Sequence, residues 1–192
     1  MNTLKPCLIF LLIALGLLQG CAATVGAGAA TGAAVVYDRR TAGTVIDDQL
    51  IEFKFLDNLR KNEGLWKQTH VNATSYNNVL LLTGEAPDGT LKQQAIDLGK
   101  RIEKVRQVHN EIVVAAPSSM LSRSSDSWVT AKIKSTMLTT EGVNPARFKV
   151  VTENGTVYLL GLVTRQEADA ATEIARTTGG VQRVVRLFEY HQ

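Results

Sequence analysis

Histidines and carboxylates are the side chains of this sequence that could carry acid–base or metal chemistry. His70, His109 and His191 are far apart along the chain, and none has a partner at the spacing of a metal site or a catalytic triad. Asp47 and Asp48 are adjacent, but such a pair at the start of a helix more often caps the helix than works as general acid and base. We therefore expect solvated histidines, no catalytic residues, no metal site, no cofactor and no enzyme activity.

The two cysteines lie in a segment that predicts export. Lys5 precedes an apolar run of about ten residues, which is signal-peptide length rather than the roughly 20 residues of a membrane-spanning helix. The run ends in LQGC at 18–21, which resembles a bacterial lipobox, whose cysteine is acylated and becomes the new N-terminus. We expect a signal peptide over 1–20, lipid on Cys21 and no disulfide, because Cys7 leaves with the signal. The alternative is an ordinary signal peptide with a chance cysteine.

The residue after the cysteine and the net charge indicate where the chain works. If Cys21 carries several acyl chains, they provide more than the two membrane-binding signals that stable anchoring needs. In lipoproteins with this kind of signal an aspartate after the cysteine usually retains the protein at the inner membrane; Ala22 stands here, so the resemblance implies the periplasmic face of the outer membrane. The 21 basic and 18 acidic residues leave 20 − 18 = +2 once Lys5 is removed, too little charge to indicate binding of nucleic acid.

The segment that begins with the cysteine, residues 21–43, is rich in alanine and glycine. Such small side chains cannot build a core, and the segment is read as a tether. Gly28 and Gly32 also form a GxxxG pattern, which is typical of helices that pack within membranes, although the stretch is too short to span one.

The rest of the chain contains an internal repeat. Residues 70–84 align with 147–161 at a constant spacing of 77, which matches Leu82 with Leu159 and Gly84 with Gly161. After one deleted residue the register continues at 76. The sequence therefore predicts two copies of one small domain, over 44–115 and 124–192, with a linker at 116–123.

Each copy carries the same succession of local patterns. Asp48 and Asp126 stand where N-cap residues would begin a helix with apolar residues at helical spacing. Alternating segments then flank Asn77-Asn78 and Asn154-Gly155, which are typical of a type I′ hairpin turn. A second helix, over about 91–104 and 166–177, and an apolar strand follow. We expect an α+β fold of order αββαβ, in which two helices cover one face of a three-stranded sheet.

The repeated segments VLLLTGEA and VYLLGLV, the helix DSWVTAKIKSTML and the strand entry GGVQRVV resemble BON domains. Two BON domains behind a lipobox resemble the dual-BON lipoproteins of the bacterial outer membrane. The resemblance extends from Asp47 to about Tyr190. It implies phospholipid association and a role in envelope integrity, with division sites as one place of action, and no known catalysis.

The first helix of the second copy suggests where phospholipid would bind. One side carries the apolar residues that cover the sheet, and the opposite side carries a second stripe that the core cannot use. A tryptophan opposite the core suits the headgroup boundary of a bilayer, and the flanking lysines suit anionic lipid. The predicted site consists of Leu121, Trp128, Lys132, Lys134, Ser135 and Leu138. The alternative is a tryptophan buried between the domains or in a satellite core.

The first helix of the first copy is apolar nearly all round. We expect Leu50, Phe53 and Leu56 on it to form an inter-domain contact, in a chain that is a monomer. The alternative to lipid binding is an adaptor, whose exposed stripes bind other envelope proteins such as outer-membrane assembly or cell-wall factors. The expected partners are thus an anionic phospholipid membrane and envelope proteins, without nucleic acid.

Overall fold

The computed structural model describes residues 38–191, and these contain the two copies. The first copy consists of α3 (Ala42–Lys61), α4 (Glu63–Gln68), β1 (His70–Tyr76), β2 (Val79–Ala86), α5 (Gly89–Lys100) and β3 (Gln107–Val114). The second consists of α6 (Met120–Thr139), the 3₁₀ turn η2 (Pro145–Arg147), β4 (Phe148–Glu153), β5 (Thr156–Val163), α7 (Arg165–Thr177) and β6 (Arg183–Tyr190). The predicted α+β fold with two αββαβ copies is confirmed, and the short helix α4 is an addition that the sequence patterns did not indicate.

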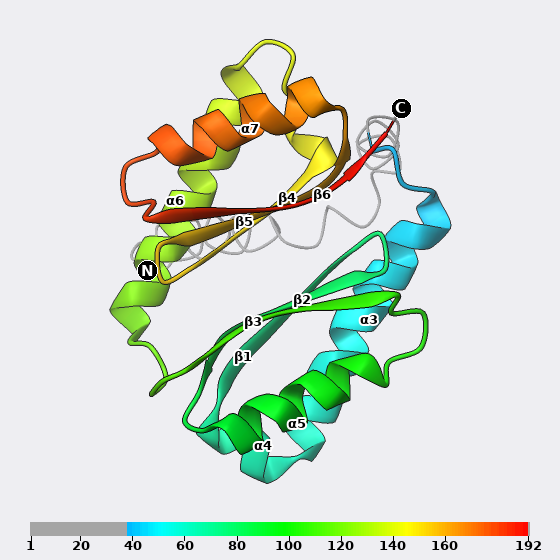
Figure 1. The fold of residues 1–192 in the computed structure, drawn as a ribbon, viewed down its shortest axis with the longest axis vertical. Helices are drawn as coiled ribbons and strands as arrows, with labels where there is room; N and C mark the ends of the chain where they lie inside the picture. Colours follow the sequence, from blue (N-terminus) through cyan, green and yellow to red (C-terminus); the bar gives the residue numbers. More distant parts are fainter. Residues whose placement is uncertain (1–37, 192) are drawn as a thin grey trace, which may run out of the picture. The chain divides into compact units, whose positions relative to one another are not determined.

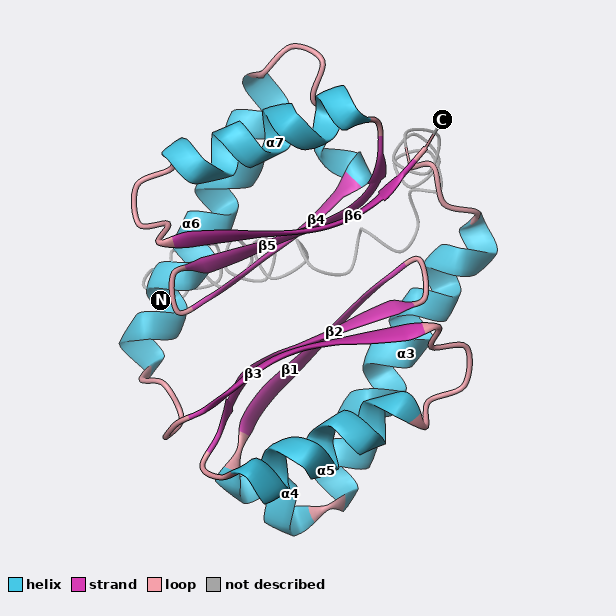
Figure 2. Ribbon diagram, in the orientation of Figure 1, coloured by secondary structure: helices cyan, strands magenta, loops and turns pink. Residues whose placement is uncertain are grey.

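Both sheets have the same topology (Figure 2). The middle strand pairs antiparallel with the strand before it and parallel with the strand after it, in the orders β1-β2-β3 and β4-β5-β6. The second helix of each copy is the crossover that a parallel connection requires. Both long helices of a copy lie on the same face of its sheet (Figure 1).

The hairpin turns have the backbone conformation that the sequence predicted. Asn77 and Asn78 have φ values of 52° and 62°, and Asn154 and Gly155 have 47° and 70°. Positive φ at both central residues defines the type I′ turn, whose twist matches that of the flanking strands.

The helix starts differ from the prediction. Thr41 caps α3 and Ser119 caps α6, so α6 begins six residues before Asp126 and takes up part of the predicted linker. Asp48 and Asp126 are buried inside the helices and do not act as caps. Cap preference and helical spacing thus identified the correct helices, but each helix begins six residues before the aspartate that was predicted to cap it.

The two aspartates instead hold the hairpin turns. The carboxylate of Asp48 accepts hydrogen bonds from the backbone N–H groups of Asn77 and Asn78, both at 2.8 Å. The carboxylate of Asp126 accepts from the N–H groups of Asn154 and Gly155 at 2.8 and 2.9 Å. A type I′ turn leaves these donors without a strand partner, and the helix supplies one in each copy.

The hallmark glycines lie where the sheet permits no side chain. A Cβ added at Gly84 would lie 1.9 Å from the carbonyl oxygen of His70, and Gly84 also has a φ of 107°. At Gly161 the same atom would lie 2.8 Å from the carbonyl oxygen of Arg147. The close approach of the first and second strands explains why the repeat retains glycine at these aligned positions.

Each domain has its own core between helices and sheet. In the first domain the core includes Ile51 and Phe55 of α3 with Leu80 and Leu82 of β2, and in the second domain Ile133 and Met137 of α6 lie at the equivalent place. A third apolar cluster joins the two domains: Tyr76 and Leu81 pack with Tyr158 and Leu160. The sheet faces that carry no helix therefore pack against each other, and β2 is buried on both faces.

Candidate functional site

The stripe predicted on α6 is exposed. Leu121 is 81 %, Trp128 60 % and Leu138 72 % accessible to solvent, and Ser135 is exposed on the same helix. Leu121 and Trp128 are seven residues apart and lie within about 20° of each other around the helix; Leu138, ten residues further on, lies about 80° from Trp128 on the same exposed side. Val129 and Ile133 on the other side are buried in the core. The alternative of a buried tryptophan is wrong, because the indole of Trp128 covers neither the core nor the domain contact.

The cation beside the indole is Lys132. Its Nζ lies 5.0 Å from the centre of the Trp128 ring, within the range of a cation–π contact. Lys134 is also exposed; it lies about 120° from Trp128 around the helix but only about 40° from Leu138, so it borders the other edge of the exposed side. The α6 surface, defined as Leu121, Trp128, Lys132, Lys134, Ser135 and Leu138, thus combines large exposed apolar side chains with two lysines, one of which contacts the indole.

The predicted inter-domain contact through α3 is wrong. Leu50 is 48 %, Phe53 66 % and Leu56 36 % exposed. The two copies do pack on each other, but through the open faces of their sheets, and α3 lies on the opposite face of its own sheet. The continuous apolar run of β2, which is typical of a strand buried on both faces, is the signal that indicates this contact in the sequence.

Polar groups close the domain contact at both of its ends. At one end the hydroxyl of Tyr76 donates to the carbonyl of Arg147 at 3.1 Å and accepts from the backbone N–H of Leu162 at 3.3 Å. Burial raises the pKa of Tyr76 and, helped by the negative charge of Glu111, raises the pKa of Tyr158 to about 12. Both phenols are therefore neutral at physiological pH.

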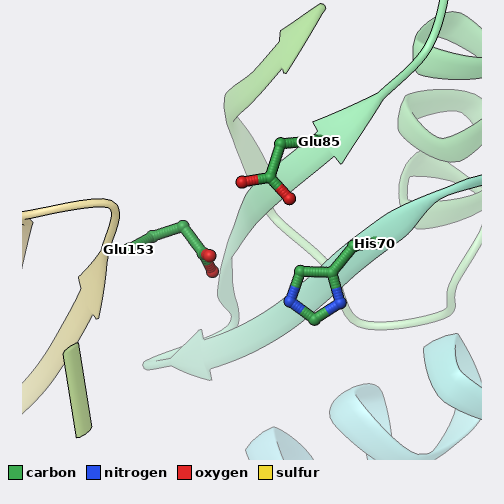
Figure 3. Close-up of side chains that lie close together, drawn as sticks. All are labelled: His70, Glu85 and Glu153. Atoms are coloured by element: carbon green, nitrogen blue, oxygen red, sulfur yellow. The ribbon is translucent and has the colours of Figure 1, made fainter. Parts of the chain in front are cut away.

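At the other end three titratable groups meet: His70 of β1, Glu85 of β2 and Glu153 of β4 (Figure 3). His70 and Glu85 are directly opposite each other in the β1–β2 pairing. Burial raises the pKa of Glu153, and the neighbouring charges of Glu85 and Asp126 raise it further. Burial and the charge of Arg123 lower the pKa of His70, while Glu85 opposes them. The expectation that all three histidines are simply solvated is therefore wrong for His70.

Sequence reasoning missed this cluster because its members are distant in the chain. Glu85 follows His70 by 15 residues, and Glu153 follows Glu85 by 68 in the other domain. The hairpin register could have paired His70 with Glu85, but only the packing of the sheets brings Glu153 to them.

Comparison with known proteins identifies the family. The BON-domain profile matches residues 47–116 and 125–192, which make up more than half of the chain. The chain belongs to the BON-domain family. The outer membrane lipoprotein DolP of Haemophilus influenzae is 42 % identical to it over 190 residues, which cover 98 % of each protein. The 21 kDa hemolysin of Actinobacillus pleuropneumoniae is 37 % identical, over 81 % of this chain and 80 % of that protein.

These matches make the chain a dual BON-domain outer-membrane lipoprotein, as the sequence resemblance implied. A solved structure of CdsD, a structural protein of the Type III secretion system of Chlamydia trachomatis, aligns with 71 % of this chain and 94 % of its own length, at 12 % identity and a TM-score of 0.30. No helix among residues 38–191 is long and apolar enough to cross a membrane. The predicted signal peptide, Cys21 and the tether up to residue 37 lie outside the described residues.

Proposed function

We propose that the chain is a non-catalytic, lipid-anchored protein on the periplasmic face of the outer membrane, which binds anionic phospholipid through the α6 surface and supports envelope integrity, including at division sites. The observation that carries the proposal is the exposed side of α6 with Leu121, Trp128 and Leu138, and with Lys132 beside the indole. An apolar ring with a polar N–H suits the bilayer interface, where the ring leaves water and the N–H stays hydrated.

The strength of such a site is modest. A lysine near an anionic surface contributes about 1 kcal/mol. A few shallow apolar side chains add a comparable amount. Once lipid on Cys21 holds the chain on the bilayer, however, the second encounter is intramolecular, and a weak site suffices. The α6 surface would then determine where on the membrane the protein resides, and the anchor would determine that it resides there.

The test is flotation of the unacylated chain, with the signal peptide removed and Cys21 replaced by alanine, on vesicles of anionic or zwitterionic phospholipid. We expect flotation with the anionic vesicles and its loss in Trp128→Glu. The first domain offers a matched control, because Trp66 is also exposed and also lies near a cation, with Arg60 5.3 Å from the ring centre. Trp66→Glu should float like the unmodified chain; equal loss in both variants would contradict the assignment to α6.

The charge preference has its own matched pair of lysine variants, one on α6 and one in the first domain. Lys132→Glu removes one attraction and adds one repulsion, so it should weaken binding to anionic vesicles by about 2 kcal/mol, roughly 30-fold. Lys67→Glu makes the same change of net charge on α4 of the first domain, where the side chain is also exposed, and should weaken binding much less. Equal effects would mean that net charge, and not the α6 surface, governs binding.

The adaptor remains the second candidate function, because α3 carries an apolar stripe of its own. Ile46, Leu50 and Phe53 are exposed on the side of α3 opposite the core. An adaptor that works through this stripe should stay soluble in the flotation test. A photo-crosslinking residue at position 53 should then capture an envelope protein in cells, while one at the equally exposed position 138 should not.

A further inference from the structure

The cluster of His70, Glu85 and Glu153 has the composition of a metal site. One ligand atom from each side chain lies within 4.8 Å of the other two. The three side chains point toward one another, two from the first domain and one from the second (Figure 3). The lipid-binding proposal does not use them.

Neither carboxylate of this cluster is in an ion pair among the described residues. Glu85 is 2 % and Glu153 9 % exposed, and none of the ion pairs among the described residues involves either one. Arg123 faces His70 from α6 but is in none of those pairs. Two buried carboxylates this close repel each other, and their burial is unfavourable without a compensating positive charge.

Neutral donors already orient both carboxylates. Glu85 accepts from the side-chain amide of Asn154 and from the backbone N–H of Ser118. Glu153 accepts from the amide of Asn72 at 3.1 Å and, more weakly, from the hydroxyl of Thr83 at 3.4 Å. These bonds hold the oxygens in place but leave the negative charges, which is the role that outer hydrogen-bond partners have around metal ligands.

The internal repeat provides a direct comparison. At a spacing of 77 residues, His70 corresponds to Arg147, Glu85 to Leu162, and Glu153 to Tyr76. The Tyr76 end of the domain contact is closed by a neutral phenol that hydrogen-bonds to the backbone of Arg147 and Leu162. At that end uncharged side chains take the positions of the two carboxylates, and the buried carboxylate nearby, Glu167, is paired with two arginines, so two unpaired carboxylates are not a requirement of the packing.

We propose that His70, Glu85 and Glu153 bind a divalent transition-metal ion of the Zn²⁺ type, which bridges the two domains. One imidazole and two carboxylates match the nitrogen and oxygen ligands of Zn²⁺, whereas Mg²⁺ and Ca²⁺ prefer oxygen ligands alone. Tetrahedral bonds of about 2.0–2.1 Å require ligand atoms about 3.4 Å apart, so small side-chain rotations suffice. A surface hollow lined by His70, Asn72 and Glu153 provides a path of entry.

The test uses the full mature chain, acylated and purified in detergent, first stripped with chelator and then titrated with ZnCl₂. At a hundredfold excess over its dissociation constant, Zn²⁺ should raise the melting temperature by about 5–10 °C. Co²⁺ should give the visible absorption of a four- or five-coordinate ion, and MgCl₂ should do neither.

Three variants separate this site from other zinc-binding groups. His70→Gln and Glu153→Gln should each lower the affinity for Zn²⁺ at least about tenfold. Glu153→Gln should also raise the melting temperature of the metal-free chain, because it removes a buried charge. His191→Gln changes a histidine outside the cluster and should bind Zn²⁺ unchanged. No rise in melting temperature, or an undiminished rise in His70→Gln, would overturn the proposal and leave a proton shared by the carboxylates as the compensation.

Discussion

At the scale of single residues, the clearest feature that both domains share is the aspartate whose carboxylate joins the first long helix to the hairpin turn. Asp126 accepts two backbone hydrogen bonds from the turn at Asn154 and Gly155. Hydrogen bonds to a charged group contribute about 1.5–3 kcal/mol each, and buried donors left without a partner are unfavourable. This residue therefore couples helix position to turn conformation.

We predict that Asp126→Ala lowers the free energy of unfolding by about 3 kcal/mol, since both turn amides lose their acceptor. Urea denaturation of the variant measures this loss. Asp57→Ala is the control: Asp57 is on α3 and makes only an exposed ion pair with Lys61, so it should change stability by less than about 0.5 kcal/mol. Equal small effects of both substitutions would mean that the turn holds its conformation without the helix.

The residue scale also marks a limit of sequence reasoning. The alignment of the repeats found Asp48 and Asp126 and placed them on the correct helices, but gave them the role of N-caps. An aspartate that precedes apolar residues at helical spacing has the same pattern whether it caps its own helix or, from inside it, accepts bonds from a distant turn. Only the position of the hairpin distinguishes the two roles.

At the scale of elements, β2 determines the architecture because its two faces serve different purposes. Leu80 and Leu82 point into the core of the first domain, and Leu81 points to the cluster shared with Tyr158 and Leu160. Because successive side chains of a strand point to opposite faces, alternate residues of the apolar run serve the core of the domain and the contact between the domains.

We predict energetic coupling between Leu81 and Leu160 that Leu82 does not share. In urea unfolding, Leu81→Ala and Leu160→Ala should each cost about 2–4 kcal/mol. The double variant should depart from additivity by about 0.5–3 kcal/mol, because both side chains belong to one cluster. The matched pair Leu82→Ala and Leu160→Ala, which are in separate clusters, should be additive within about 0.5 kcal/mol. Additivity in both pairs would contradict a stabilising contact between the sheets.

Elements with strong local signals were predictable. The turns at Asn77-Asn78 and Asn154-Gly155 require positive φ, and asparagine and glycine are the residue types that adopt it most readily. The exposed apolar side of α6 followed from helical geometry, since the core uses the opposite side of the helix. The contact between the domains was assigned to α3 because both the apolar side of this helix and the second face of β2 could have covered the other domain. The sequence alone did not show which of the two does so.

At the scale of the whole molecule, Glu167 of α7 links parts of the chain that are far apart. It pairs with Arg39, which precedes the first helix of the first domain, at 2.5 Å, and also with Arg147. It also accepts a hydrogen bond from the backbone N–H of Thr164 at 2.8 Å in the capping box of α7. Burial alone would raise the pKa of this carboxyl group, but the bonds from Arg39, Thr164 and Arg147 outweigh it and lower the pKa to about 2.

This lowered pKa predicts a specific acid sensitivity. A carboxyl group whose pKa is lower in the folded state stabilises the fold above its unfolded pKa, near 4.5, and the stabilisation is lost as the pH falls toward about 2. Glu167→Gln cannot ionise, so at pH 7 it should be less stable than the unmodified chain by about 2–3 kcal/mol. The difference should shrink between pH 4.5 and 2 and vanish near pH 2, as measured by urea unfolding at each pH.

Glu173→Gln is the control: it alters an exposed carboxylate of the same helix, paired with Arg176, and should have a much smaller effect on stability at every pH. A stability difference for Glu167→Gln that persisted unchanged at pH 2 would show that Glu167 acts through side-chain packing, because the contribution of its ion pairs with Arg39 and Arg147 must disappear once the carboxyl group is protonated in both states.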